Sequence, residues 1–173
     1  MNLKMKMKMN LNIVLLEPEI PQNTGNIGRT CKAMDAALHL IEPLGFSIED
    51  KYLKRAGMDY WKDLDVSYYR NFDDFMMKNP RGQKVFMSQK AGHRCDRFTY
   101  VSNVYLVFGK ESLGLPEDLL IENQDACVRV PMSEGTRSLN LANVVSILCY
   151  EVMRQKDFAG LMTQGKLKSI SIK

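Results

Sequence analysis

The sequence has few residues of the kinds that build metal sites. It contains only two histidines, His39 and His93, and four cysteines without any CxxC pair. A zinc site needs three or four such ligands in closely spaced groups, so we expect neither a structural nor a catalytic metal. The cysteines are instead expected to be buried free thiols, since three of the four fall in segments predicted as helix or strand.

Several common ligand-binding and catalytic motifs are missing as well. The chain has no GxGxxG dinucleotide loop, no GxxxxGK[ST] phosphate loop and no GxSxG nucleophile elbow. These absences argue against a generic nucleotide-binding enzyme and against a serine hydrolase of that type. The chain also lacks an apolar run of the roughly 20 residues that span a bilayer, and it has no apolar signal-peptide region. We therefore expect a cytoplasmic protein without a membrane segment.

Positive charge is concentrated at the two ends of the chain. The net charge is +4, and six lysines lie within 1–10 and 159–173, where no acidic residue occurs. The remainder is therefore slightly negative, so an RNA-binding surface would have to be a local patch rather than a general positive field. The residues of two candidate patches are Lys51, Lys54 and Arg55 in one, and Arg81, Lys84, Lys90, Arg94 and Arg97 in the other. A solvated charged surface is the alternative for both.

A regular alternation of strand and helix patterns fills the chain, whose length suits one domain with a substantial core. Short apolar runs predict strands at 11–16, 38–41, 66–69, 84–88, 105–108 and 126–130. Helices are predicted from Asn23 or Thr24 to about 35, at 49–55, at 72–78, from 117 onward, and at 139–155. The alternation predicts an α/β domain with a mostly parallel sheet flanked by helices.

Three glycine-containing loops follow predicted strands, at 23–29, 109–116 and 132–140. Ligands of open α/β sheets bind beyond the carboxyl ends of the strands, so these loops predict one pocket rich in backbone donors. The polar residues expected at its rim are Arg29, Glu111, Ser138 and Asn140. Ser138 is also expected to cap the last helix. An ordinary strand-to-helix connection is the alternative for each loop taken alone.

The last predicted helix, 139–155, is apolar on nearly every side. An exposed helix keeps a polar face, so this one should be buried against more than its own sheet. We expect a two-fold homodimer contact through this C-terminal helix, which a charge at Leu148 should disrupt. A central helix inside a monomer is the alternative.

Three motifs, in this order, resemble the signature motifs of SPOUT-class RNA ribose 2′-O-methyltransferases. They are NTGNIGR at 23–29, FGKESLGLP at 108–116, and the segment 130–141, which contains RSLNL. The opening segment 17–21, the segment 55–61 and the small size resemble the minimal single-domain subfamily of that class. That subfamily methylates the wobble nucleotide of tRNA, a cytidine or uridine at position 34.

The resemblance implies an α/β fold with a C-terminal trefoil knot, an obligate homodimer, and no metal. The methyltransferase domain would cover 11–160, between an extension at 1–10 that we expect to be dispensable and a basic tail at 161–173. The implied cofactor is S-adenosyl-L-methionine, with S-adenosyl-L-homocysteine as its product. The implied partner is tRNA, bound at its anticodon stem-loop.

The resemblance also implies which residues form the site. Those expected to bind the cofactor are Met87 or its neighbour Ser88, Gly109, Val130, Ser138 and Leu139. A side chain at Gly109 would block close approach of the cofactor to the backbone, although a plain turn glycine is the alternative.

The expected catalytic residues are Arg29 and Asn140. The family gives the arginine the role of proton acceptor, but a guanidinium is always protonated, so stabilising a developing alkoxide or holding a phosphate is easier to defend. Asn140 would orient the ribose or the cofactor, with helix capping as its alternative. Glu111 would hold backbone donors or Arg29, and Arg137 could contact phosphate.

Three other functions stay open at this point. The enzyme could methylate ribosomal RNA or another tRNA position, although the lack of a separate RNA-binding domain favours a compact substrate such as an anticodon stem-loop. A non-catalytic RNA-binding knot protein is a second alternative, which the intact Arg29, Gly109 and Asn140 argue against. A generic nucleotide-binding enzyme is the third and lacks a phosphate loop.

Overall fold

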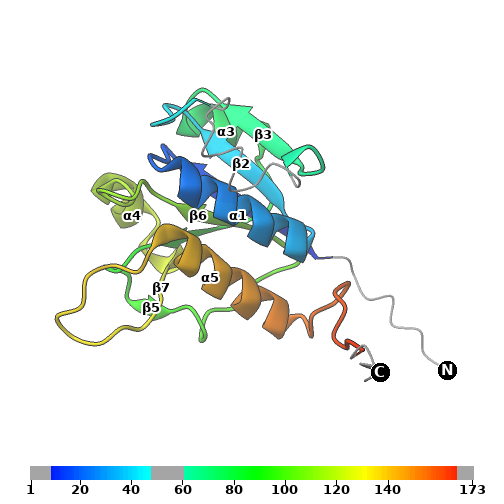
Figure 1. Ribbon diagram of the computed structural model, residues 1–173. Coiled ribbons are helices and arrows are strands. Elements are labelled where there is room, and N and C mark those ends of the chain that lie inside the picture. Colours follow the sequence, from blue (N-terminus) through cyan, green and yellow to red (C-terminus); the bar gives the residue numbers. More distant parts are fainter. Residues whose placement is uncertain (1–8, 48–60, 167–173) are drawn as a thin grey trace, which may run out of the picture.

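Seven parallel strands form the centre of the molecule, in the order β3-β2-β1-β6-β4-β7-β5 (Figure 1). The structure is a computed structural model that describes residues 9–47 and 61–166. The strands are β1 (Asn10–Leu16), β2 (Ala37–Ile41), β3 (Val66–Tyr69), β4 (Gln83–Met87), β5 (His93–Arg94), β6 (Asn103–Phe108) and β7 (Cys127–Arg129). The helices are α1 (Pro21–Met34), α3 (Phe72–Lys78), α4 (Glu117–Glu122), a 3-10 turn (Gln124–Ala126) and α5 (Leu141–Gln155). The expected α/β architecture is confirmed.

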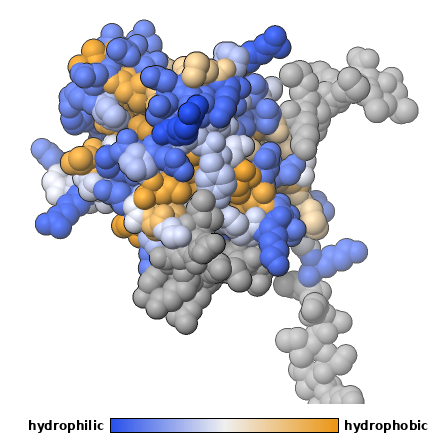
Figure 2. All heavy atoms as spheres, turned by 90° about the horizontal axis from the view of Figure 1, so that it is seen from above, coloured by the Kyte–Doolittle hydropathy of each residue, from blue (hydrophilic) through white to orange (hydrophobic). Residues whose placement is uncertain are grey.

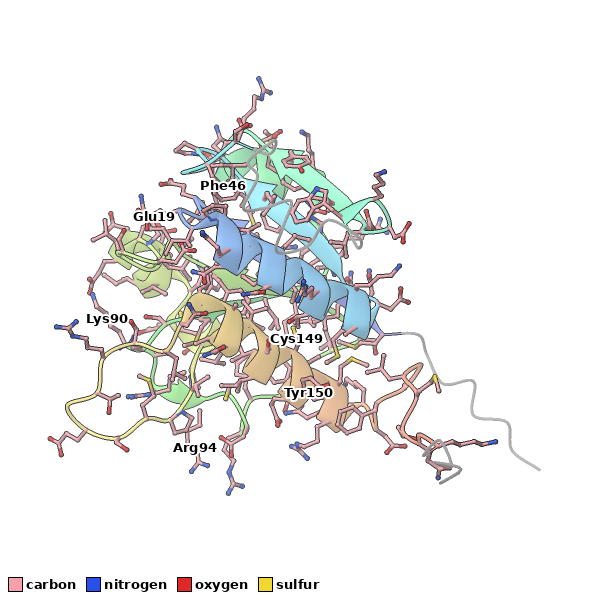
Figure 3. All side chains as sticks on the ribbon, in the orientation of Figure 1. Glu19, Phe46, Lys90, Arg94, Cys149 and Tyr150 are labelled. Carbon is pink, nitrogen blue, oxygen red and sulfur yellow. The ribbon has the colours of Figure 1, made fainter. Side chains whose placement is uncertain are left out.

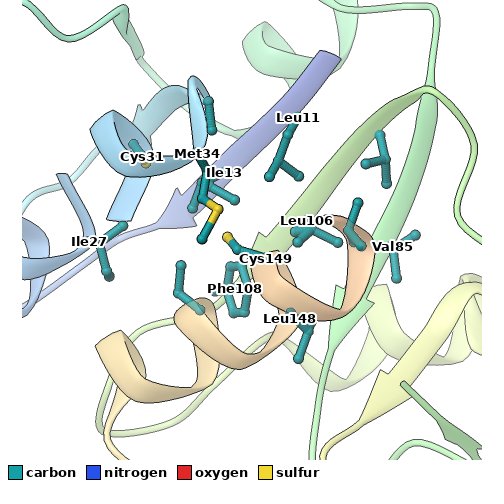
Figure 4. Packing of buried hydrophobic residues seen from close by; sticks show 14 of the residues in the cluster. Leu11, Ile13, Ile27, Cys31, Met34, Val85, Leu106, Phe108, Leu148 and Cys149 are labelled. Carbon is teal, nitrogen blue, oxygen red and sulfur yellow. The ribbon is translucent and has the colours of Figure 1, made fainter. Parts of the chain in front are cut away.

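Helices cover both faces of the sheet. Alternate residues of each strand point to opposite sides, so the apolar side chains of the central strands need cover on both. On β1, Ile13 and Leu15 enter the core under α1 and α5, whereas Val14 and Leu16 enter the core under α3 and α4. Figure 4 shows the first of these cores, in which side chains of α1 and α5 meet those of β1 and β6. The central strands are buried on both faces, as parallel strands between helices require.

Helix α1 begins earlier than the sequence predicted. Pro21 occupies the first helical positions, where its fixed φ suits a helix start and its missing N–H is not needed. Asn23 and Thr24 therefore lie inside the helix and do not cap it, and Ile20 at the N-cap makes no side-chain cap. Gly28 lies mid-helix, where an added Cβ would be 3.0 Å from Leu64 Cδ1. This glycine permits close packing.

The start of α5 also differs from the prediction. Asn140, and not Ser138, is the N-cap: its side-chain oxygen accepts from the Ala142 backbone N–H at 2.9 Å. The two-residue strand β5 was not predicted, because a pair of polar residues carries no alternating apolar pattern. The predicted helix at 49–55 and most of the segment 55–61 lie outside the described residues.

The four cysteines are free and buried, which confirms that prediction. Burial raises the pKa of the Cys31 thiol to about 12. This thiol therefore stays protonated near neutral pH and is unreactive. Within 9–47 and 61–166, no group of three or more potential ligands could hold a metal ion.

Helix α5 is buried mainly by its own chain. Seven of its residues are buried, and the helix lies beside α1, where Thr30 and Ser146 form a hydroxyl pair 3.0 Å apart (Figure 1). The alternative of a helix inside the monomer thus accounts for most of its apolar residues. Ile147 and Tyr150 remain on its outer face, 40% and 56% exposed. The face seen in Figure 2 mixes hydrophilic side chains with hydrophobic patches.

No helix within the described ranges is long and apolar enough to cross a membrane.

Candidate functional site

A cavity of about 310 Å³ opens at the carboxyl edge of the sheet, where β4 and β6 end. It is lined by the end of β4 and the turn after it, by the loop after β6, and by the start of α5. The lining residues that the sequence analysis had singled out are Met87, Ser88, Gly109, Glu111, Ser138 and Leu139. Its volume lies in the range of small-molecule sites.

Two carboxylates tie the loop after β1 to the loop after β6. Glu17 forms an ion pair with Lys110, with 2.6 Å between Oε2 and Nζ, and this contact raises the pKa of the lysine. The Glu19 carboxylate accepts from the backbone N–H and the hydroxyl of Ser112, at 2.9 and 2.8 Å. The hydrogen bonds from Ser112 lower the pKa of Glu19. Figure 3 shows Glu19 at this junction.

A third carboxylate works in the opposite direction across the same two loops. Glu111 accepts from the backbone N–H groups of Glu19 and Ile20, at 2.8 and 3.3 Å, and from Asn23 Nδ2 at 2.9 Å. Asn23 Oδ1 in turn accepts from Asn140 Nδ2 at 2.9 Å. Residues from all three sequence motifs are therefore joined by side-chain hydrogen bonds.

The loop after β6 folds tightly on itself. Lys110 and Gly114 form an isolated antiparallel bridge, and Gly114 has a φ of +72°. A Cβ built on Gly109 would lie 2.1 Å from the carbonyl carbon of Gly114, closer than real contacts allow. The fold of the loop therefore requires glycine at 109, whether or not a cofactor is bound. This supports the alternative reading of Gly109 as a turn glycine.

The structure brings most of the predicted site residues together. Asn140 follows the cavity-lining Leu139 and is exposed, while its partner Asn23 is only 6% exposed. Val130 is buried and lines a different, apolar hollow beside α5. Arg29 is exposed on α1 and does not line this cavity.

Five residues of the site were not predicted to belong to it, and one of them, Asn23, was expected only at the start of a helix. They are Glu17, Glu19, Asn23, Lys110 and Ser112. All five lie inside the segments 17–21, 23–29 and 109–116, which carry the family resemblance. Their pairing could not be seen because the partners are roughly ninety residues apart in the chain.

Comparison with known proteins identifies the family. The model of the SpoU rRNA Methylase family matches residues 10–150. A tRNA (cytidine(34)-2′-O)-methyltransferase of Saccharophagus degradans is 44% identical over 150 residues, 86% of this chain and 97% of its own. A solved structure described as giving insights into the 2-OH methylation of C/U34 on tRNA has a TM-score of 0.82 and 38% identity, covering 87% of this chain and 98% of that one.

A more distant structure shares the fold. It is the SpoU methyltransferase AviRb from Streptomyces viridochromogenes in complex with AdoMet, with a TM-score of 0.77 and 22% identity, covering 88% of this chain and 60% of that one. The resemblance seen in the three motifs is thereby confirmed. The chain belongs to the SpoU rRNA methylase family of RNA methyltransferases.

Proposed function

We propose that this protein transfers a methyl group from S-adenosyl-L-methionine to the ribose 2′-hydroxyl of the wobble nucleotide of tRNA. One observation carries the proposal: relatives named for methylation at position 34 match this chain over 97% and 98% of their own length. The family description names ribosomal RNA, but that description covers many enzymes. The near-complete match to the position-34 enzymes favours tRNA.

The cavity at the carboxyl edge suits the cofactor. It combines backbone groups of the loop after β6 with the apolar side chains of Met87 and Leu139. We assign cofactor binding to these two residues with Gly109 and Ser138. Val130, which was expected to bind the cofactor, does not line this cavity and belongs to the hydrophobic core against which Met87 and Leu139 pack. When bound, S-adenosyl-L-methionine supplies a methyl group on a positively charged sulfur, and S-adenosyl-L-homocysteine remains.

The chain's own residues then have to place the ribose and stabilise its oxygen. Methyl transfer to a hydroxyl is an in-line displacement that depends on positioning and on a route for the hydroxyl proton. We assign positioning of the ribose to Asn140, which stands at the cavity edge. We assign electrostatic stabilisation of the developing alkoxide, or phosphate binding, to Arg29, because its guanidinium keeps its proton. Its exposure on α1 is compatible with contact to RNA.

A homodimer through α5 belongs to the proposal. Ile147 and Tyr150 stand on the outer face of α5, beside an apolar hollow of about 480 Å³ that Val130, Pro131 and Phe158 also line. An exposed apolar surface of this kind is typical of a protein contact. A charge at Leu148 would not test this contact, because Leu148 is 0% exposed in the core of the single chain. The test belongs on Tyr150.

Three further features complete the proposal. The trefoil knot is proposed from membership of the family. The strand order is compatible with it, because β7 lies between β4 and β5 and not beside β6, the strand that precedes it in the chain. The anticodon stem-loop is proposed as the bound part of tRNA, because the position-34 nucleotide lies there. A tRNA substrate favours the cytoplasm.

Methyl incorporation tests the proposed function. The purified protein would be incubated with labelled S-adenosyl-L-methionine and, separately, with total tRNA and with ribosomal RNA. Label in tRNA alone is the expected result. Label in ribosomal RNA alone would keep the enzyme class and discard the substrate, and no label in either, with the cofactor still bound, would support a non-catalytic RNA-binding protein.

A further inference from the structure

A directed row of hydrogen bonds leads from the loop after β6 to the start of α5. Glu111 accepts from Asn23, Asn23 accepts from Asn140, and Asn140 accepts from the backbone N–H of Ala142, each at 2.9 Å. We call the three side chains, Glu111, Asn23 and Asn140, the amide relay.

Both ends of the amide relay fix its direction. A carboxylate has no hydrogen to donate, and three N–H groups converge on Glu111, so Asn23 must turn its nitrogen toward it. Asn23 therefore presents its oxygen to Asn140. At the other end, the first turn of α5 offers an N–H, so Asn140 must turn its oxygen toward Ala142. The two requirements agree.

This direction decides what Asn140 can offer to a ligand. Its oxygen faces the first turn of α5, and one of its two N–H groups donates to Asn23. The second N–H is not needed by the relay. Asn140 is exposed beside Leu139 and Leu141, which line the cavity.

We propose that Asn23 and Glu111 are positioning residues which force Asn140 to meet the ribose as a hydrogen-bond donor to the 2′-oxygen. The inference rests on the proposed function. A donor at that place stabilises negative charge on the oxygen as its proton leaves, and it keeps a lone pair directed at the methyl group. In this arrangement Asn140 does not receive the hydroxyl proton, which passes to solvent water as the bond between the 2′-oxygen and the methyl carbon forms and the bond from that carbon to the cofactor sulfur breaks.

Exchanging the carboxylate and the amide within the relay tests its direction. In Glu111→Gln one of the two acceptor oxygens becomes an amide nitrogen, so the hydrogen bond from either Asn23 or the Glu19 backbone N–H is lost. In Asn23→Asp two carboxylates face each other and repel. Each change disturbs the contact that holds Asn23 against Asn140, so each single variant should lower kcat, by no more than the roughly hundred-fold that complete loss of the Asn140 donor would cost. In Asn23→Asp the KM for the cofactor should stay near the wild-type value, because Asn23 does not line the cavity.

The double variant Asn23→Asp with Glu111→Gln should recover activity. The glutamine amide then donates to the new aspartate, which still accepts from Asn140, so Asn140 keeps its orientation. We expect kcat within about ten-fold of wild type, the sign of strong coupling between neighbouring sites. A double variant no better than the worse single variant would overturn the proposal.

The pH profile gives a second readout that a merely structural role would not move. In Asn23→Asp, one proton shared by the two carboxyl groups would remove their repulsion and restore the hydrogen bond between positions 23 and 111. The kcat of this variant should therefore rise toward that of wild type as pH falls. A ratio of variant to wild-type kcat that does not change with pH would contradict the relay.

A matched pair of helix caps isolates the donor. Asn71 caps α3 through its oxygen, which accepts from Asp74 N at 2.8 Å, as Asn140 caps α5. An aspartate caps either helix, but at 140 it cannot donate to Asn23 or to the ribose. Asn140→Asp should lose kcat roughly a hundred-fold, whereas Asn71→Asp should keep it. Equal activity of the two variants would overturn the proposal.

Thermal unfolding separates failure of the relay from failure of the proposed function. Each single exchange should lower the unfolding midpoint, and the double exchange should recover it, whatever RNA the protein modifies. Recovery of the midpoint without methyl transfer by the wild type would reject the proposed function and leave the hydrogen-bond direction supported. Absence of recovery in both unfolding and kcat would reject the relay.

Discussion

Replacement of Gly109 by alanine should disable the cofactor cavity. The added Cβ would lie 2.1 Å from the Gly114 carbonyl carbon and 2.3 Å from the Leu115 backbone nitrogen, whereas ordinary contacts begin at 3.4 Å. These are backbone atoms, which cannot rotate away as a side chain could. The loop after β6 must therefore open by about 1 Å.

That displacement acts on the cavity itself, since Gly109, Gly114 and Leu115 all line it. Misplacement by about 1 Å can cost a hundred-fold in rate. We expect Gly109→Ala to bind S-adenosyl-L-homocysteine at least ten-fold more weakly, a loss of about 1.4 kcal/mol. Isothermal titration calorimetry measures this directly.

Gly92→Ala is the matched control. Gly92 lies in the turn before β5, where an added Cβ meets no atom within 4 Å, and it does not line the cofactor cavity. Its affinity should equal that of wild type. Wild-type affinity in Gly109→Ala would refute the reasoning, because the loop would then tolerate a side chain that its backbone geometry excludes.

Three further predictions concern His39, Arg29 and α5. Burial lowers the pKa of His39 to about 4, against a smaller opposing effect of Asp65. As pH falls, the histidine is therefore protonated in the unfolded chain before it is protonated in the folded one. The free energy of unfolding should fall by about 3 kcal/mol between pH 6.5 and 4. Denaturant titrations should show this slope in wild type and not in His39→Gln; an equal slope would contradict it. Arg29→Ala should abolish methyl transfer and leave calorimetric cofactor affinity within a few-fold, whereas lost affinity would place Arg29 in the cofactor site. Tyr150→Glu should sediment as a monomer at micromolar concentration, and an intact dimer would exclude this face of α5.

The strands and the edge that holds the site could be predicted from local pattern. Buried parallel strands are continuous apolar runs, and 66–69 and 72–78 match β3 and α3 to the residue. The ends of helices were less predictable. Capping residues are frequent near both starts. The first helix was therefore predicted from Asn23 or Thr24 although it begins at Pro21, and Ser138 was taken for the cap that Asn140 provides.

The inner organisation of the site could not be predicted from the sequence. The motifs indicated which segments meet, but not that Glu19 and Glu111 each bind the other's loop. Such pairs depend on the register of β1 against β6, in which Leu15 lies beside Phe108. The reason for glycine at 109 could not be predicted either. Glycine is required there because the backbone of Gly114 lies too close for a side chain, and no sequence periodicity specifies the path of the loop that brings Gly114 there.

A single-atom change in the substrate tests the central claim most directly. Two anticodon stem-loops would be prepared with the same sequence, one all-ribose and one with a 2′-deoxyribose at the wobble nucleotide only. With labelled S-adenosyl-L-methionine, the ribose form should accept one methyl group and the deoxy form none, because the acceptor oxygen is missing. Equal labelling of both would contradict methylation of the wobble ribose.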